Sequence, residues 1–169
     1  MYYGDASQIS ETGYVPYAWQ FPEEEVVIPA ARGASLNCFG LLSRKNELVF
    51  ETTQNTINAA FVVAFLDAFS STLTRPTVVV LDNASVHTAK KVKERLAIWQ
   101  NRGLFIFYLP PYSPNLNIIE RMWKELKGRW LKPEDYASTD MLFYATKLAL
   151  QAVGAELCIQ FNAFNYNST

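Results

Sequence analysis

Three carboxylates are the side chains of this 169-residue chain that are best placed to do chemistry. Asp5 and Asp82 stand where two predicted strands end, and Glu120 lies in the first turn of a predicted helix. Ligands of open α/β sheets bind beyond the carboxyl ends of the strands, and neighbouring strands would place the two aspartates about 5 Å apart. One or two divalent cations can bridge carboxylates at that distance. Three carboxylates without a His or Cys cluster favour Mg²⁺ or Mn²⁺ over zinc.

Two of these carboxylates also have a simpler structural interpretation. Asp82, followed by Asn83, fits a turn or cap at a strand-to-helix junction. The stretch Asn117–Glu120 has the form of a capping box, with Glu120 as the third helical residue. This pattern alone favours the cap for Glu120, although the helix N-terminus would also keep its carboxylate ionised, as a metal ligand requires.

Other catalytic chemistries have little support in the sequence. His87 is the one histidine, Ser85 lies two residues before it, and there is no Gly-x-Ser-x-Gly motif, which argues against a nucleophilic triad. Without a glycine-rich phosphate loop, NTPase and nucleotide-cofactor functions are not supported either. Cys38 and Cys158 are far apart and in no metal-ligand spacing, so we expect neither a disulfide framework nor a zinc knuckle.

Basic residues are concentrated in the middle of the chain. In total, 15 Lys and Arg face 16 Asp and Glu, for a net charge of −1. Residues 1–83 carry 4 basic and 9 acidic groups, residues 84–132 carry 10 and 3, and residues 133–169 carry 1 and 4. The middle segment, at +7, can present a positive face to a polyanion such as DNA. A solvated helix surface is the simpler explanation, and charge alone favours it.

The order of the predicted elements favours an α/β fold with a mixed sheet and helices in three layers. Half of the residues are hydrophobic and 18% are charged, which is typical of one globular domain. Two apolar runs enclose a helix, and this βαβ unit predicts two parallel strands buried on both faces. The predicted strands are Met1–Asp5, Ser35–Ser43, Glu47–Thr53, Thr77–Leu81 and Leu104–Leu109, and the predicted helices are Thr56–Phe69, Thr88–Asn101, Asn117–Leu131 and Ser138–Val153. The last helix carries an apolar face made of Met141, Tyr144, Ala145, Leu148 and Ala152.

Two ordered motifs surround the second and third candidate carboxylates. The run Leu81–His87 reads LDNASVH and precedes a basic helix, and the run Leu109–Trp123 reads LPPYSPNLNIIERMW. Together they resemble the catalytic domain of DDE transposases, in particular the bacterial insertion-sequence branch of the mariner superfamily. Tyr3-Gly4-Asp5 falls where this family places its first acidic residue, whereas Ile118 stands where the family usually has proline.

This resemblance covers nearly the whole chain and implies a ribonuclease-H-like fold in a single domain, residues 1–169. It assigns Asp5, Asp82 and Glu120 to the metal-binding catalytic triad, which moves our interpretation of Glu120 from cap to ligand. It also implies two Mg²⁺ or Mn²⁺ ions per site, which support phosphodiester cleavage and strand transfer. The implied partners are the element ends and a double-stranded DNA target, cut at a TA dinucleotide by a homodimer assembled on the DNA.

Further residues are expected to contact DNA or to border the site. Lys124 and Lys127 lie one and two turns beyond Glu120 on the same helix face, where they can hold phosphates beside the scissile one. Asn83 is expected to order the strand-end turn. His87 either touches DNA or the edge of the site, or is a satisfied structural histidine. The remaining expected DNA contacts are Lys90, Lys91 and Arg121.

Two other functions stay open at this point, namely a metal-dependent nuclease without strand transfer and a non-catalytic dimerisation or regulatory fragment of a transposase. The helix-turn-helix modules that precede this domain in mariner-type transposases are absent before Asp5, which fits an excised domain, a second reading frame or a remnant. The segment Glu11–Gly33 is the expected protruding contact region. Because no signal peptide or membrane span is evident, we expect a cytoplasmic, nucleoid-associated bacterial protein without a membrane partner.

Overall fold

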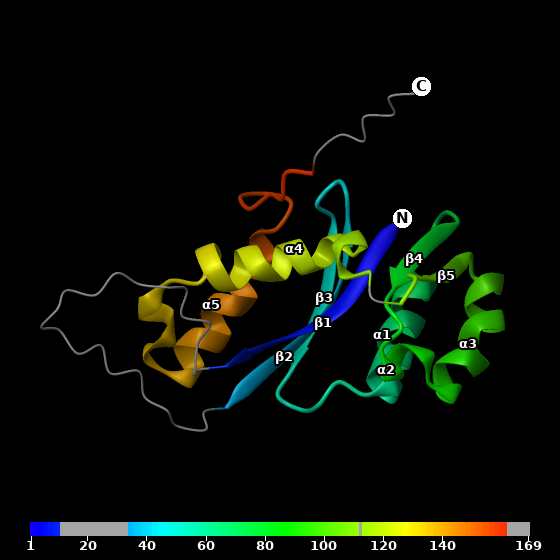
Figure 1. Ribbon diagram of the computed structural model, residues 1–169, viewed down its shortest axis with the longest axis horizontal. Helices are drawn as coiled ribbons and strands as arrows, with labels where there is room; N and C mark the ends of the chain where they lie inside the picture. The colour runs from blue at the N-terminus through cyan, green and yellow to red at the C-terminus, as the bar shows by residue number, and fades with distance from the viewer. Residues whose placement is uncertain (11–33, 112, 162–169) are drawn as a thin grey trace, which may run out of the picture.

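The chain forms one mixed five-stranded sheet (Figure 1). The computed structural model describes residues 1–10, 34–111 and 113–161, so the expected contact region Glu11–Gly33 lies outside the described residues. The strands are β1 (Tyr2–Ser10), β2 (Ser35–Ser43), β3 (Leu48–Thr53), β4 (Thr77–Leu81) and β5 (Leu104–Tyr108). They lie in the order β3-β2-β1-β4-β5, and the pairings of β1 with β4 and of β4 with β5 are parallel. The expected mixed sheet and the parallel βαβ unit are confirmed.

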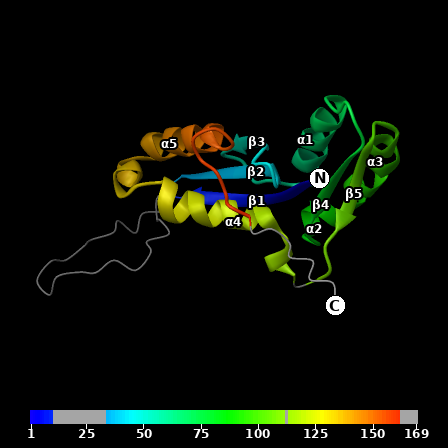
Figure 2. The ribbon, with the colours of Figure 1, turned by 90° about the horizontal axis from the view of Figure 1, so that it is seen from above.

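Helices cover both faces of this sheet, which gives the expected three layers (Figure 2). They are α1 (Ala59–Ser71), α2 (Ser85–Thr88), α3 (Lys90–Asn101), α4 (Ile118–Glu125) and α5 (Thr139–Ala152), with 3-10 turns at Pro114–Leu116 and Pro133–Ala137 and a π-helical turn at Leu126–Trp130. α1 and α3 share one hydrophobic core with the sheet, and α4 and α5 share the other. Within the described part of the chain, no helix is long and apolar enough to span a membrane.

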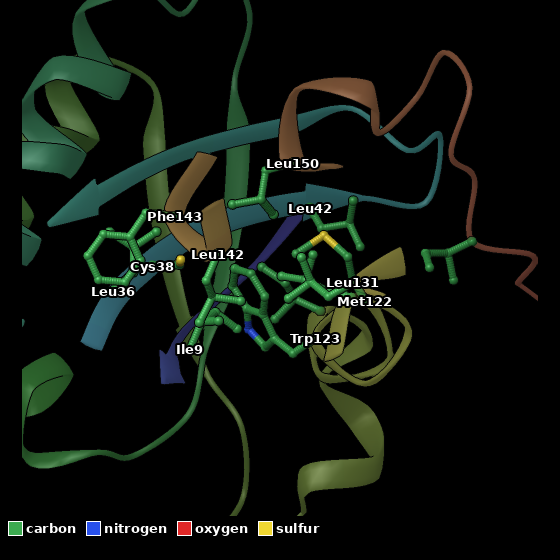
Figure 3. Close-up of a cluster of buried hydrophobic side chains, with 13 residues drawn as sticks. Ile9, Leu36, Cys38, Leu42, Met122, Trp123, Leu131, Leu142, Phe143 and Leu150 are labelled. Atoms are coloured by element: carbon green, nitrogen blue, oxygen red, sulfur yellow. The ribbon is translucent and has the colours of Figure 1, made fainter. Parts of the chain in front are cut away.

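β2, which lies between β3 and β1, supplies side chains to both cores. Phe39 and Leu41 point to the α1 and α3 side, where they join the cluster that contains the buried Trp99 of α3. Cys38 and Leu42 point to the opposite side, into the cluster drawn in Figure 3. This alternation follows from the two-residue period of a strand, and burial on both faces fixes the register that places the site.

The structure corrects the predicted end of the first strand. β1 continues five residues past Asp5, because it pairs antiparallel with β2 along its whole length, from Tyr2 opposite Ser43 to Ser10 opposite Ser35. Asp5 therefore lies in the middle of β1. It nevertheless lies beyond the parallel pairing with β4, which joins Tyr2 to Val79 and Tyr3 to Val80.

Two predicted burial patterns are also wrong. The expected apolar face of the last helix is exposed at Met141, Tyr144 and Leu148, because α5 packs through a different face made of Leu142, Phe143, Thr146 and Leu150. β4 and β5 are covered on both faces only in part, since α4 lies against β1 and β2. On that side of the sheet the described residues bury Val80 but leave Val78, Phe105 and Phe107 exposed.

Two helices begin later than predicted, and the helix predicted to reach Leu131 changes after Glu125 to a π-helical turn. α1 begins after Asn58, three residues later than predicted, because the Asn58 side chain accepts hydrogen bonds from the backbone of Ala60 and Phe61. The helix predicted to begin at Thr88 begins at Lys90, because Ala89 has an extended backbone with ψ of 151°. The short helix α2, which was not predicted, precedes Ala89 and carries His87 to Asp82.

Candidate active site

Asp5 is positioned by the close approach of β1 to its neighbours. Continuing the register of β1 and β4 by two residues places Asp5 opposite Asp82. The residue before it is glycine, and a Cβ atom there would stand 2.6 Å from Leu81 Cδ2 and 2.7 Å from Leu41 Cδ2, so any larger residue would force these leucines or β1 to shift. The side chains of the two leucines therefore lie against the β1 backbone at Gly4, and Asp5 is the next residue along β1.

Asp82 is held in the turn between β4 and α2 through one of its two oxygens. Its Oδ1 accepts hydrogen bonds from the backbone N of Ala84 at 3.0 Å and from His87 Nδ1 at 2.6 Å. The next residue, Asn83, donates to the carbonyl of Leu109 at the end of β5 and anchors the turn. The hydrogen bond from His87 is the main reason why the pKa of Asp82 is lowered. Asp82 is therefore a carboxylate that stays ionised and ordered.

His87 lies beneath Asp82 and not on the surface. Only 1% of the residue is exposed, and its ring packs edge-on against Phe39, with centroids 5.9 Å apart. The hydroxyl of Tyr108 donates to its carbonyl at 2.9 Å. Such burial leaves no ring surface for DNA, and its Nε2 has no hydrogen-bond partner among the described residues, so it is not a fully satisfied structural histidine either.

Glu120 stands at the start of α4 without acting as a cap. The expected capping box is absent, because Asn117 makes no side-chain hydrogen bond to the helix N-terminus. Instead, the buried Asn117 donates from Nδ2 to the carbonyl of Gly4 at 3.1 Å. This bond ties the first turn of α4 to β1 beside Asp5, and it leaves the Glu120 carboxylate free for another role.

Two depressions meet at Glu120. The Asp82 pocket, of about 380 Å³, is lined by Asp82, Asn83, Ala84, Leu109, Pro110, Pro111, Ser113, Asn117 and Glu120. The Asp5 pocket, of about 500 Å³, is lined by Asp5, Ala6, Ser7, Glu120, Trp123, Lys124 and Lys127. Because Glu120 lines both, the structure brings the three predicted carboxylates to one continuous edge of the sheet, with two of the predicted lysines at one end of it.

The buried position of Asp5 among other carboxylates disfavours its ionisation. Burial is the main cause that raises the pKa of Asp5 to about 6; the charges of Asp82 and Glu120 add to the rise, and the backbone N–H of Ala6 and the nearby His87 oppose it. Burial lowers the pKa of Lys127, and the charge of Asp5 acts in the opposite direction. A cation at this edge would relieve the repulsion, and carboxylate oxygens are the ligands that Mg²⁺ and Mn²⁺ prefer.

The side chains as they stand do not enclose an ion. Within residues 1–10, 34–111 and 113–161, no group of three His, Cys, Asp or Glu side chains is close enough to hold a metal together. The carboxylate oxygens of the three residues nevertheless fit a hard divalent ion in charge and in chemical type. The side chains would have to rotate to bind the same ion. Oδ2 of Asp82 accepts no hydrogen bond from any described residue and is available for such a role.

The other predicted DNA contacts lie away from this edge. Lys90 and Lys91 are exposed at the start of α3 and line neither pocket. Arg121 lines a separate depression on the outer side of α4, together with Glu125 and Arg129. Asn117 is the residue that the sequence interpretation missed, because its position before a helix gave only the signal of a cap.

Comparison with known proteins bears on the family and the fold of the chain. A family model described as DDE superfamily endonuclease matches residues 1–142. No curated protein matches the sequence. The fold is ribonuclease-H-like, as expected, because the chain is similar in structure to catalytic cores of transposases and integrases.

Three of the similar solved structures illustrate this. A simian T-cell lymphotropic virus intasome, in complex with PP2A regulatory subunit B56 gamma, has 12% sequence identity and a TM-score of 0.63, over 94% of this chain and 49% of that one. The Mos1 strand transfer complex has 18% identity and a TM-score of 0.52, over 90% and 51%. The catalytic core domain of BIV integrase has 17% identity and a TM-score of 0.53, over 72% and 77%. The chain thus spans about half the length of the first two, and these low identities show the fold alone.

Proposed function

Because the chain belongs to the DDE superfamily of endonucleases, we propose that it is a transposase catalytic domain that cleaves DNA phosphodiester bonds and transfers the cut strand to a target. The observation that carries the proposal is the meeting of the two pockets at Glu120, with Asp5 in one and Asp82 in the other. A phosphodiester seated at Glu120 would have a carboxylate on either side, and its flanking nucleotides would extend into the two pockets.

Asp5, Asp82 and Glu120 are the residues that would hold Mg²⁺ or Mn²⁺, two ions per site. When bound, such ions activate the attacking hydroxyl oxygen and stabilise the leaving oxygen. The chain itself supplies the positioning: Asn83 fixes the turn that carries Asp82, and Asn117 fixes α4 against β1. Without a cation the site is electrostatically frustrated, since Asp5 is buried beside two other carboxylates.

Lys124 and Lys127 would hold the DNA backbone at the Asp5 end of the site. Both line the Asp5 pocket with Glu120, and Lys127 is half-buried there. No ion pair joins either lysine to an acidic residue in the described part of the chain, so both charges are available to phosphates. Lys90, Lys91 and Arg121 would contact DNA only farther from the scissile phosphate, if the duplex extends over α3 or the outer side of α4.

The finer assignments follow from the resemblance of the two motifs to the mariner superfamily. We propose double-stranded DNA as the partner, with element ends and a TA-type target, and a homodimer assembled on it. Among the similar structures, a Mos1 strand transfer complex, a Mos1 paired-end complex with the left transposon end and a viral intasome support this choice. Such a protein of a bacterial insertion sequence would act at the nucleoid, in the cytoplasm.

The test supplies the purified chain with Mn²⁺, a target plasmid and a pre-cut oligonucleotide with a free 3′-hydroxyl. We expect joined products that disappear in Asp82→Asn. The matched control is Glu51→Gln, an exposed carboxylate of β3 outside the site. Cleavage without joining would favour a nuclease that lacks strand transfer, and a soluble dimer that performs neither reaction would favour a non-catalytic fragment.

A further inference from the structure

Asp82 holds its carboxylate in an asymmetric way. Both of its hydrogen bonds, from Ala84 N at 3.0 Å and from His87 Nδ1 at 2.6 Å, fall on Oδ1, while Oδ2 accepts nothing from the described residues. The side chain is 46% exposed, so packing alone does not fix its orientation. Whatever orients Oδ2 toward the pocket must therefore act through Oδ1.

His87 is rigid enough to provide that orientation. The residue is 1% exposed, its ring packs against Phe39, and its backbone N–H donates to the carbonyl of Ala84 at 2.9 Å. The Tyr108 hydroxyl binds its carbonyl from β5. These contacts with the sheet and with the start of α2 hold the imidazole in place. Through its hydrogen bond to the imidazole, Asp82 is then fixed relative to β4 and β5.

The ring has one polar contact among the described residues, and that contact is Asp82. Its Nε2 is buried without a hydrogen-bond partner, which costs free energy that an apolar side chain of similar size would not cost. A carboxylate oxygen accepts, so Nδ1 is the nitrogen that carries the proton. A residue retained for packing alone would not need this arrangement.

We infer that His87 is a positioning residue that pins Oδ1 of Asp82 and thereby presents Oδ2 to the ion at the active edge. This inference rests on the proposed function. His87 is too deeply buried to touch the ion or the DNA, so its effect on either must pass through Asp82. Hydrogen-bond partners that orient a metal-ligating side chain typically contribute about 10- to 100-fold to metal affinity.

Three substitutions at this position and its surroundings separate orientation from packing. His87→Leu keeps most of the volume and removes the donor. His87→Asn keeps an amide nitrogen at the position of Nδ1. Thr88→Val removes a hydrogen bond of 3.2 Å to the Ala84 carbonyl in the same short helix, without touching Asp82. Mn²⁺ binding is measured by titration calorimetry on the full chain, with folding checked by circular dichroism.

We expect Mn²⁺ to bind about 10- to 100-fold more weakly to His87→Leu, and within a few-fold of the native affinity to His87→Asn and Thr88→Val. Native affinity in a folded His87→Leu would overturn the inference while leaving the metal site intact. Loss of Mn²⁺ binding in Asp5→Asn and in Asp82→Asn is the separate test of the proposed function. If the native chain bound no Mn²⁺, both the metal site and the role of His87 would be refuted.

A second measurement does not depend on the folding of a variant. His87 is the one histidine in the chain, so selective ¹⁵N-histidine labelling gives a single imidazole in the NMR spectrum. We expect the tautomer protonated at Nδ1, and we expect its Nδ1–H signal to move when Mg²⁺ is added, although the ring cannot reach the ion. A tautomer protonated at Nε2, or a ring signal indifferent to Mg²⁺ while other resonances of the site respond, would overturn the inference.

Discussion

Replacing Asp5 with Asn should stabilise the metal-free protein, although it removes a residue of the proposed active site. The Asp5 carboxylate is buried in β1 beside two other carboxylates, and its pKa is raised from 3.8 to about 6. In the unfolded chain this carboxyl group ionises at its ordinary pKa, so ionisation favours the unfolded state. The fold therefore loses stability as pH rises from about 4 through about 6, and this loss is complete above that range.

The size of the effect follows from the shift. Each pKa unit corresponds to about 1.4 kcal/mol, so a shift of about two units sets an upper value of about 3 kcal/mol at pH 8. An amide of the same shape carries no charge and avoids this cost. For a chain of this size, 1 kcal/mol changes the melting temperature by about 2–4 °C, so the variant should melt above the native protein by at most about 6–12 °C.

The assay is thermal unfolding followed by circular dichroism in EDTA, at pH 8 and at pH 4, and then again with Mg²⁺ at pH 8. The advantage of Asp5→Asn should be present at pH 8 and vanish at pH 4, where the native carboxyl group is neutral in the fold. Mg²⁺ should raise the melting temperature of the native protein and leave that of the variant unchanged. Glu51→Gln, on the exposed side of β3, serves as the control and should change stability by less than about 0.5 kcal/mol.

Equal melting temperatures of the two proteins at pH 8 in EDTA would refute this reasoning. A gain that persists unchanged at pH 4 would refute it as well, because the stabilisation would then have a cause other than charge.

Three further predictions address the DNA contacts and the framework of the site. Lys124→Ala combined with Lys127→Ala should weaken DNA binding and reduce the slope of log affinity against log salt by about 2, measured by fluorescence anisotropy over a KCl series; an unchanged slope would remove both lysines from the interface. Asp67→Asn should cost about 2 kcal/mol in urea unfolding, because Asp67 Oδ1 accepts from Arg95 at 2.6 Å and from the Trp99 indole at 2.8 Å, joining α1 to α3. Burial alone would raise the pKa of Asp67, but these hydrogen bonds and the neighbouring charges lower it. The contribution of Asp67 to folding stability is therefore present above about pH 4 and lost in stronger acid. An equal loss of stability in Asp67→Asn at pH 2 and at pH 7 would contradict this assignment. Gly4→Ala should destabilise the fold by about 1–3 kcal/mol and weaken Mn²⁺ binding, since its methyl group would overlap two leucine side chains; a variant with native stability would show that β1 can shift to make room.

The sequence predicted the sheet better than the surroundings of the site. The strand Thr77–Leu81 has the predicted bounds, and β5 ends at Tyr108, one residue earlier than predicted, because both are short apolar runs bounded by polar or turn residues. Asp5 looked like a strand end because polar residues follow it, whereas pairing with β2 extends β1 to Ser10. Long-range pairing of this kind has no local signal.

Local sequence patterns could not predict the side-chain hydrogen bonds that position the site. Asn117 stands before a helix and predicts a cap, yet its amide binds Gly4, which lies 113 residues earlier in the chain. The contact between His87 and Asp82 spans five residues, but it is made from the short helix α2, which no apolar period in the sequence revealed. α5 shows a related limit, since it has two apolar faces and only the tertiary fold decides which one is buried.

The parallel ladder between β1 and β4 has a mechanical consequence for the proposed enzyme. It joins two residue pairs, whereas nine pairs join β1 to β2 and five join β4 to β5. Asp5 and Glu120 lie on one side of this narrow seam, tied together through Asn117, and Asp82 lies on the other side with β4. Backbone amides should therefore exchange most readily at the pairing of β1 with β4. A cation bound by carboxylates on both sides of this pairing would hold the two parts of the sheet together and slow hydrogen exchange in both of them.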